Sequence, residues 1–466
     1  MKKLNAFLMS VLTTAALNAA VIEQVIVRQQ WPWSTDVKVE YKLSGVTSPV
    51  DINVTALNGE VPLDDTRLQS SITGDLFAIA TDGVGSFTID PVKAFGTASV
   101  ALANFKVKLT LSASDPRANE VLYKIVQLDS PYKVSNVTRK DILSGRMGTF
   151  ETKFENLDPA FSTPLEDVVI WTGVTNDIAY KTTSMVFRRI PAGDASYLFQ
   201  EGVKTVNDGE GLPVSFSKDF YLAVFPMTQA QALKLNSTLT FFFTNEQFAA
   251  TRPADKMGYN YRVRGATDGQ RWPEGDHTTI DAKNGYTDLV IYQMQEKTGL
   301  LVDLPTETMW EFACRGGVRG NVLYSGQTGD AAAAKLLVSK LINNGAASTN
   351  QNADDTEGTR PVGSFLPNAY GLYDMLGNIE EWCLEVYTSE ANLKTLGEGV
   401  CYGKDPRGST ETSGTGTYRI TRGCSYQYAW TPTVTARSGN AAPAQNWTQF
   451  GLRLAIYLDK NDDGTK

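Results

Sequence analysis

The sequence predicts an α+β protein, in which a strand-rich N-terminal part precedes a larger part with few helices and long loops. Apolar and polar residues alternate in Val37–Leu43 and Phe105–Leu111, as expected for strands, whose successive side chains point to opposite faces. Asp288–Thr298 instead has apolar residues at helical spacing and is followed by Gly299, a typical helix C-terminus. The length of 466 residues suits two or three domains.

Residues 1–20 are predicted to form an export signal. Met1–Lys3 is a charged start, Leu4–Leu17 is mostly apolar, and Asn18–Ala20 offers small residues for cleavage. The alternative is an uncleaved anchor, but the apolar run is shorter than the ~20 residues that span a bilayer. No later stretch has the length and apolar character to cross one. We therefore expect a bacterial protein that is secreted, periplasmic or on the cell surface.

Residues 21–117 are predicted to form a small β-sandwich-like domain. Val50–Val54 and Phe87–Ile89 add short strands, and Asn58-Gly59 and Asp82-Gly83 are typical hairpin turns. Large aromatic residues dominate core burial, so Trp31–Trp33 is expected to anchor the core or an edge. No catalytic constellation is visible, and a spacer or adhesion role is expected.

Residues 118–184 are predicted to connect the two domains and to contribute a buried run, Val168–Trp171. In the part that follows, Thr228 and Thr306 are predicted helix N-caps, because a threonine hydroxyl accepts a bond from a free N–H group of the first turn. Glu307, one residue after Thr306, lies in the first turn, where its charge suits the helix dipole.

The net charge of the chain indicates which classes of binding partner to expect. The formal net charge is −8. A nucleic-acid or anionic-membrane partner would need a basic patch, so neither is expected, whereas cation binding is compatible with this charge.

The four cysteines, Cys314, Cys383, Cys401 and Cys424, are even in number, and export permits disulfides. Three sets of pairings are possible for four cysteines. Cys401 and Cys424 bracket a polar loop rich in glycine and threonine, which slightly favours that pair.

Gly371–Cys383 is the segment most suggestive of a site. Asp374 and Glu381 flank Gly377, so a folded loop can aim both carboxylates and free carbonyl oxygens at one point, as a hard cation requires. The alternative is a solvated loop anchored by one buried residue, Trp382.

Four motifs in order resemble the formylglycine-generating enzyme (sulfatase-modifying factor) superfamily: Leu304–Gly317, Gly371–Cys383, Arg419–Tyr426 and Phe450–Ala455. The resemblance covers residues 185–458 and leaves 459–466 as a tail. It implies a variant of the C-type-lectin-like fold with little regular secondary structure. It also implies structural roles for Glu307, Glu311 and Arg315.

The resemblance implies two calcium sites. The first would use the side chains of Asp374 and Glu381 and the carbonyl oxygens of Gly377 and Ile379. The second would use residues before the GLY turn: Asn343 or Asn344, Asp354 and Thr356. The alternative to a metal site is an ordinary turn, because Asn and Asp residues are common in turns that bind no metal.

Oxidase activity in this superfamily depends on two cysteines that bind copper(I), a metal that prefers thiolates. The matching interval here, Ser425–Ala436, has no cysteine, and Cys424 stands alone just before it. Copper is therefore not expected. The only histidine, His277, cannot build the three-histidine iron site of a related branch and is expected to be an exposed loop residue.

Two functions follow. The first is a non-catalytic, calcium-stabilised binding or structural module, a pseudoenzyme with an unknown peptide, protein or glycan ligand. Its candidate ligand surface consists of four aromatic residues, which could equally fill a loop-rich core: Tyr426, Tyr428, Trp430 and Trp447. The alternative is an active oxidase that converts a sulfatase Cys or Ser to formylglycine through a divergent metal site.

Overall fold

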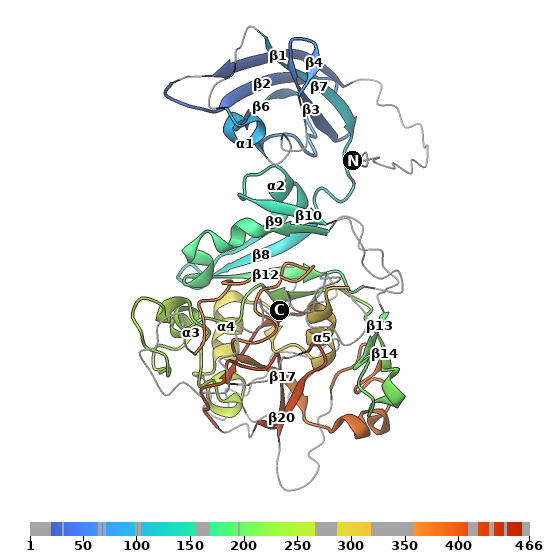
Figure 1. The fold of residues 1–466 in the computed structure, drawn as a ribbon, viewed down its shortest axis with the longest axis vertical. Helices are drawn as coiled ribbons and strands as arrows, with labels where there is room; N and C mark the ends of the chain where they lie inside the picture. The colour runs from blue at the N-terminus through green and yellow to red at the C-terminus, as the bar shows by residue number, and fades with distance from the viewer. Residues whose placement is uncertain are drawn as a thin grey trace. The chain divides into compact units, whose positions relative to one another are not determined.

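A computed structural model describes residues 20–29, 32–63, 68, 71–97, 100, 104–153, 168–193, 196–265, 287–317, 358–408, 418–427, 433–441 and 445–458. The chain divides into two units, shown in Figure 1. The N-terminal unit comprises residues 1–120 and 138–149, and the C-terminal unit comprises 121–137 and 150–466. The segment predicted to connect two domains is thus divided between the two units.

The N-terminal unit contains two antiparallel sheets. The first has the order β1-β2-β6-β5, with bounds Val21–Gln29, Val37–Ser44, Gly83–Ile89 and Ile72–Gly74. The second has the order β4-β3-β7, with bounds Val61–Pro62, Val50–Asn58 and Phe105–Ala113. The described part of this unit also contains two short helices, α1 (Pro91–Phe95) and α2 (Arg139–Leu143).

The alternating runs form the predicted strands and build the core of this unit. Alternate residues of β2 and β3 are buried, and together they form one apolar cluster. Two details of the prediction are wrong. Residues 75–82 join β5 to β6, so Asp82-Gly83 is not a hairpin turn. Trp33, for which a core or edge position was predicted, is 88% exposed, because its turn lies beyond the last paired residues of β1 and β2. Trp31 lies outside the described residues.

The described residues of the C-terminal unit form three sheets and one strand pair. The largest has the order β16-β22-β15-β12-β8-β9, with bounds Val302–Asp303, Ala455–Ile456, Phe220–Ala223, Ser184–Ile190, Val121–Gln127 and Val134–Thr138. The second has the order β20-β19-β17-β21, with bounds Arg437–Ala441, Arg419–Arg422, Glu380–Val386 and Phe450–Gly451. The third is β13-β14-β18 (Ser196–Phe199, Leu212–Ser215, Gly403–Lys404), and β10 (Phe150–Lys153) pairs with β11 (Val168–Trp171).

Three α-helices lie in the described part of this unit, and their caps confirm the sequence predictions. Thr228 caps α3 (Gln229–Leu235) and Thr306 caps α5 (Glu307–Arg315). α4 (Val290–Thr298) ends at Gly299, whose φ of 69° is left-handed, a conformation that glycine adopts without strain. Short 3-10 turns are η2 (Thr172–Thr175), η3 (Ile178–Lys181), η4 (Asn207–Gly209), η5 (Ala249–Thr251) and η8 (Glu390–Leu396), and η6 (Tyr259–Val263) is a π-helical turn.

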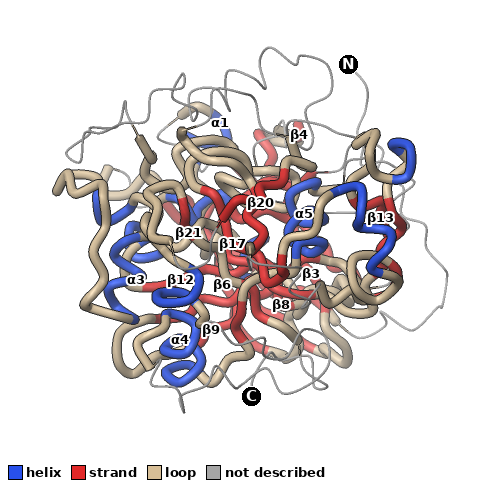
Figure 2. Tube along the Cα trace, turned by 90° about the horizontal axis from the view of Figure 1, so that it is seen from below, coloured by secondary structure: helices blue, strands red, loops and turns tan. Residues whose placement is uncertain are grey.

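Strand β17 lies between the two cores of this unit, near the middle of the view in Figure 2. Every residue of β17 is buried. Because successive side chains point to opposite faces, Trp382 packs into one apolar cluster and Cys383 into the other. The Gly371–Cys383 segment therefore ends in a strand that is buried on both faces.

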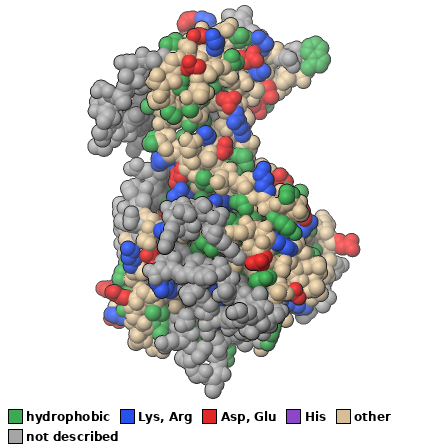
Figure 3. Space-filling view, turned by 180° about the vertical axis from the view of Figure 1, so that it is seen from behind, with side chains coloured by type: hydrophobic (Ala, Val, Ile, Leu, Met, Phe, Trp, Pro, Cys, Tyr) green, Lys and Arg blue, Asp and Glu red, His purple; other side chains and the backbone are tan. Residues whose placement is uncertain are grey.

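On the face drawn in Figure 3, basic and acidic side chains of the described residues are interspersed. No helix in the described part of the chain combines the length and apolar character needed to cross a membrane.

Candidate functional site

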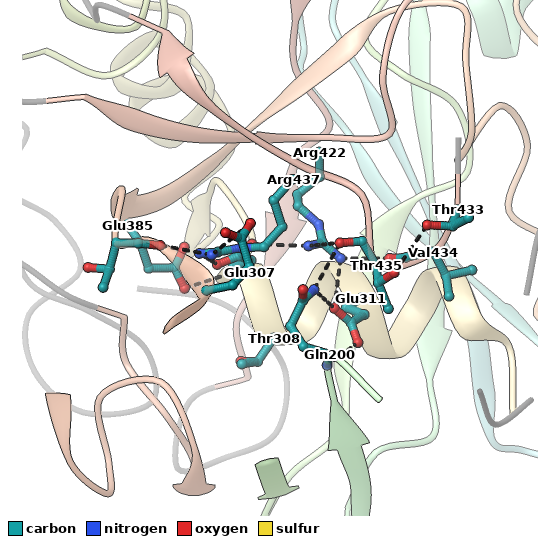
Figure 4. A network of polar contacts seen from close by, with 12 residues as sticks. Gln200, Glu307, Thr308, Glu311, Glu385, Arg422, Thr433, Val434, Thr435 and Arg437 are labelled. Atoms are coloured by element: carbon teal, nitrogen blue, oxygen red, sulfur yellow. Dashed lines mark hydrogen bonds and ion pairs between the residues drawn. The ribbon is translucent and has the colours of Figure 1, made fainter. Parts of the chain in front are cut away.

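A buried network of acids and arginines joins α5 to the sheet that contains β17 (Figure 4). Glu307 accepts hydrogen bonds from Arg437 at 2.5 and 2.7 Å and from Arg422 at 3.1 Å. Glu311 accepts from Arg422 at 2.8 Å and from Arg315 at 2.7 Å. Burial alone would raise the pKa of Glu311, but the two guanidinium groups hold it below its ordinary value. The network consists of buried ion pairs that link α5 to strands β19 and β20. This arrangement matches the structural role that the resemblance implies for Glu307, Glu311 and Arg315.

A second buried ion pair lies at the end of the Gly371–Cys383 segment. Arg453 Nη2 donates to Glu381 Oε1 at 2.8 Å, and Arg453 Nε lies 3.0–3.1 Å from both oxygens. Trp310 Nε1 donates to Glu381 Oε2 at 2.7 Å. Both carboxylate oxygens of Glu381 are therefore engaged by protein donors.

Asp374 lies near this pair, but only one of its two carboxylate oxygens has a hydrogen-bond partner among the described residues. Its φ is 55°, and its Oδ2 accepts the N–H of Gly363 at 2.7 Å. Its Oδ1 is buried and has no hydrogen-bond partner among the described residues. Burial raises the pKa of Asp374 to about 6, because the Gly363 bond and the nearby Arg453 offset only part of the lost solvation.

The first predicted calcium site fits a cation in part. The orphaned Oδ1 of Asp374 is the kind of hard oxygen that calcium binds. The carbonyl of Gly377 accepts the N–H of Ile379 at 2.9 Å, which leaves it one lone pair. Glu381, however, gives its contacts to Arg453 and Trp310. A cation here would be held by Asp374 Oδ1, and the carbonyl oxygens of Gly377 and Ile379 are the further ligands that the family resemblance implies.

The second predicted calcium site, with Asn343 or Asn344, Asp354 and Thr356, lies outside the described residues, as does His277. Within the described ranges, no three or more His, Cys, Asp or Glu side chains are grouped as a metal site would need.

All four cysteines are buried free thiols, so the disulfide favoured between Cys401 and Cys424 is wrong. Burial raises the pKa of Cys401 to about 12, and it also raises the pKa values of Cys314, Cys383 and Cys424. Since the thiolate is the form that binds metals, these thiols are poor ligands as placed.

The predicted aromatic surface is reduced to one exposed residue in the described part. Tyr426 is fully buried, because its ring packs edge-on against Phe243, with the ring centroids 5.2 Å apart. Its predicted position on the ligand surface is therefore wrong. Its hydroxyl lies 2.9 Å from Thr448 Oγ1. Trp447 is 43% exposed and stacks on Phe450 at 5.5 Å. Tyr428 and Trp430 lie outside the described residues.

The sequence reasoning missed the arginines that neutralise the buried acids. Arg422 and Arg453 lie within the motifs Arg419–Tyr426 and Phe450–Ala455, so their signal was present. The pairing is not visible in sequence, because Arg453 and Glu381 are 72 residues apart.

Comparison with known proteins gives one family match. The model of the sulfatase-modifying factor enzyme 1-like domain matches residues 183–458. The formylglycine-generating enzyme of Mus musculus is 31% identical over 159 residues, which are 33% of this chain and 38% of that protein. The enzyme of Thermomonospora curvata is 33% identical over 157 residues, 33% of this chain and 48% of its own.

A protein described as inactive C-alpha-formylglycine-generating enzyme 2, from Mus musculus, is 40% identical over 85 residues, 18% of this chain and 26% of that protein. The matched region is under half the length of each of these relatives. Among solved structures, Treponema denticola variable protein 1 matches 59% of this chain and 95% of its own, with 17% identity and a TM-score of 0.41. PvdO from Pseudomonas aeruginosa matches 58% of this chain and 93% of its own, with 21% identity and a TM-score of 0.38.

Proposed function

Because this chain belongs to the sulfatase-modifying factor enzyme 1-like family, we propose that it is an exported, non-catalytic member that binds a glycan through the surface around Trp447. The C-terminal unit has a C-type-lectin-like fold in this proposal, and the N-terminal unit is a β-sandwich spacer. The apolar start of the sequence supports export from a bacterial cell.

The state of the thiols is the observation that carries the non-catalytic role. Copper(I) chemistry needs two thiolates at one accessible point. Here Cys314, Cys383, Cys401 and Cys424 are buried, which raises the pKa of each thiol, and the interval Ser425–Ala436 contains no cysteine. The alternative oxidase, favoured by the similarity to formylglycine-generating enzymes, would need a different metal site.

The setting of Trp447 supports a neutral ligand. Its ring stacks on Phe450, and its neighbours in sequence are the amide Asn446 and the hydroxyl Thr448. Gln427 Nε2 donates to Thr448 Oγ1 at 2.9 Å. An aromatic face with hydrogen-bonding neighbours suits a sugar ring. A peptide is the competing ligand, and the test below separates the two.

Replacing Trp447 by Ala is expected to weaken glycan binding at least tenfold, because central aromatic contacts dominate binding energy. The wild type would first be screened on glycan and peptide arrays, and the hit measured by calorimetry. Trp33→Ala is the matched control, since Trp33 is 88% exposed in the other unit, and it should bind like the wild type. No glycan hit, or a Trp447→Ala affinity equal to that of the wild type, would contradict the proposal.

We also propose calcium as a structural cofactor at Asp374. Calcium at ~100 times its Kd adds about 2.7 kcal/mol to the free energy of unfolding, which is expected to raise the Tm by roughly 5 °C over chelator-treated protein. Asp374→Ala, which removes the ligand oxygen, should abolish this rise, while Asp129→Ala, at an exposed residue paired with Lys234, should keep it. A Tm unchanged by chelator would count against the site.

A further inference from the structure

The exposed side chain of Asn446, which directly precedes Trp447, is bonded to the backbone of Gly258. The buried N–H of Gly258 donates to Asn446 Oδ1 at 3.1 Å and shares its proton with the carbonyl oxygen of Lys256, also at 3.1 Å. Because a backbone N–H needs an acceptor, the oxygen of the Asn446 amide faces the protein. The nitrogen of this amide, with two N–H groups, is left for a ligand beside Trp447.

Gly258 is required here for space and not for its backbone conformation. Its φ of −65° and ψ of 131° are ordinary for residues with a side chain. A Cβ atom at this position would lie 2.3 Å from Asn446 Oδ1 and 3.1 Å from the carbonyl oxygen of Gln445. Because Gly258 has no side chain, Asn446 can approach its N–H and is held in this orientation.

A second amide, Gln427, is bonded to Thr448, the residue that follows Trp447. Gln427 Nε2 donates to Tyr426 Oη and to Thr448 Oγ1, both at 2.9 Å, and these two hydroxyl oxygens also lie 2.9 Å apart. Each contact needs a proton, and the amide NH₂ group supplies two while one hydroxyl supplies the third. An amide oxygen in the same place would leave one contact without a proton. The carbonyl oxygen of Gln427 is therefore directed away from both hydroxyls.

We propose that Asn446 and Gln427 determine the specificity of the surface around Trp447 for a neutral sugar. Asn446 Nδ2 donates to one hydroxyl oxygen of the sugar, and Gln427 Oε1 accepts the proton of another hydroxyl. Within the part of the chain that the structure describes, neither atom has a hydrogen-bond partner. Gly258 acts through Asn446 and is a positioning residue. This inference rests on the proposed glycan-binding function and names the ligand groups that the surface recognises.

The combination of one donor and one acceptor favours hydroxyl groups, because a hydroxyl can fill either role. A carboxylate or sulfate oxygen carries no proton and cannot satisfy Gln427 Oε1. An acceptor left without a partner in a bound complex costs affinity, so a sugar with an anionic group at this point is disfavoured. The ring of Trp447 offers the same stacking area to neutral and acidic sugars, so the two amides make the distinction.

Calorimetry with the neutral glycan identified on the array tests this assignment in the full-length protein. Asn446→Ala and Gln427→Ala are each expected to weaken binding about fivefold, the usual contribution of one hydrogen bond. Gly258→Ala should weaken it as much as Asn446→Ala and keep the wild-type Tm, because the exposed end of the Asn446 side chain can move aside. The double variant Gly258→Ala/Asn446→Ala should bind like Asn446→Ala, since both changes remove one interaction. Gln24→Ala, which removes an exposed amide of β1 in the other unit, should bind like the wild type.

Monodeoxy analogues of the same glycan identify the hydroxyls that the two amides contact. One analogue should bind the wild type about fivefold more weakly than the parent glycan, yet bind Asn446→Ala as well as the parent does. A different analogue should behave in the same way with Gln427→Ala. This pairing of a variant with an analogue is a result that a purely structural role of either amide would not produce.

A glycan that needs Trp447 but binds Asn446→Ala and Gln427→Ala like the wild type would overturn the inference and leave the proposed function standing. Acidic glycans as the strongest hits would overturn the assignment of Gln427 as the acceptor. A Gly258→Ala protein that binds like the wild type would overturn the positioning role. An array without any glycan hit would contradict the proposed function, and the inference with it.

Discussion

Glu311→Gln is expected to lower the free energy of unfolding of the C-terminal unit by about 3–5 kcal/mol, because it removes one partner of a buried ion pair. Glu311 is fully buried, and its oxygens accept from Arg315, Arg422 and Gln200. Glutamine keeps the shape but removes the charge and places an NH₂ group where an acceptor stood. Arg315 and Arg422 then both lose the buried charge of Glu311, although Arg422 still pairs with Glu307.

Urea unfolding followed by tryptophan fluorescence measures this loss. Glu390→Gln is the matched control, because Glu390 is one-third exposed and lies 3.6 Å from Arg437. Glu390 is partly exposed, and Arg437 keeps its two bonds to Glu307 in this variant, so the loss should stay below about 1 kcal/mol. A Glu311→Gln protein as stable as the control would show that the network does not hold α5 to β19.

Arg453→Met is expected to cost about 4 kcal/mol, since it leaves Glu381 buried with its charge uncompensated. It also removes donors to three carbonyl groups: Arg453 bonds Ala223 at 2.8 Å, Val224 at 2.9 Å and Tyr373 at 2.7 Å. The loss would again be measured by urea unfolding.

The double variant Glu381→Gln/Arg453→Met gives the control for this second prediction. Because the two side chains share one interaction, the double variant should lose clearly less than the sum of the single losses. Strictly additive losses would mean that Glu381 is held by something other than Arg453, such as a bound cation.

Local features of the fold were predictable from sequence. The N-caps at Thr228 and Thr306 and the end of α4 at Gly299 depend on residues within one helical turn. Alternation predicted β2 and β7 for the same reason. Trp33 was misplaced because its burial depends on where a turn projects, which its neighbours in sequence do not determine.

The candidate site was predictable only in its residue types. The sequence identified Asp374 and Glu381 as oxygen donors, and the structure shows one with an orphaned oxygen and the other paired with Arg453. That difference arises from packing between segments far apart in the chain.

A copper(I) titration of the purified protein, followed by aldehyde detection on a sulfatase-type Cys-x-Pro-x-Arg peptide, tests the non-catalytic role most directly. The account predicts no stoichiometric copper binding and a peptide whose cysteine is unchanged. One tightly bound copper(I) per chain together with a peptide aldehyde formed over many turnovers would contradict it.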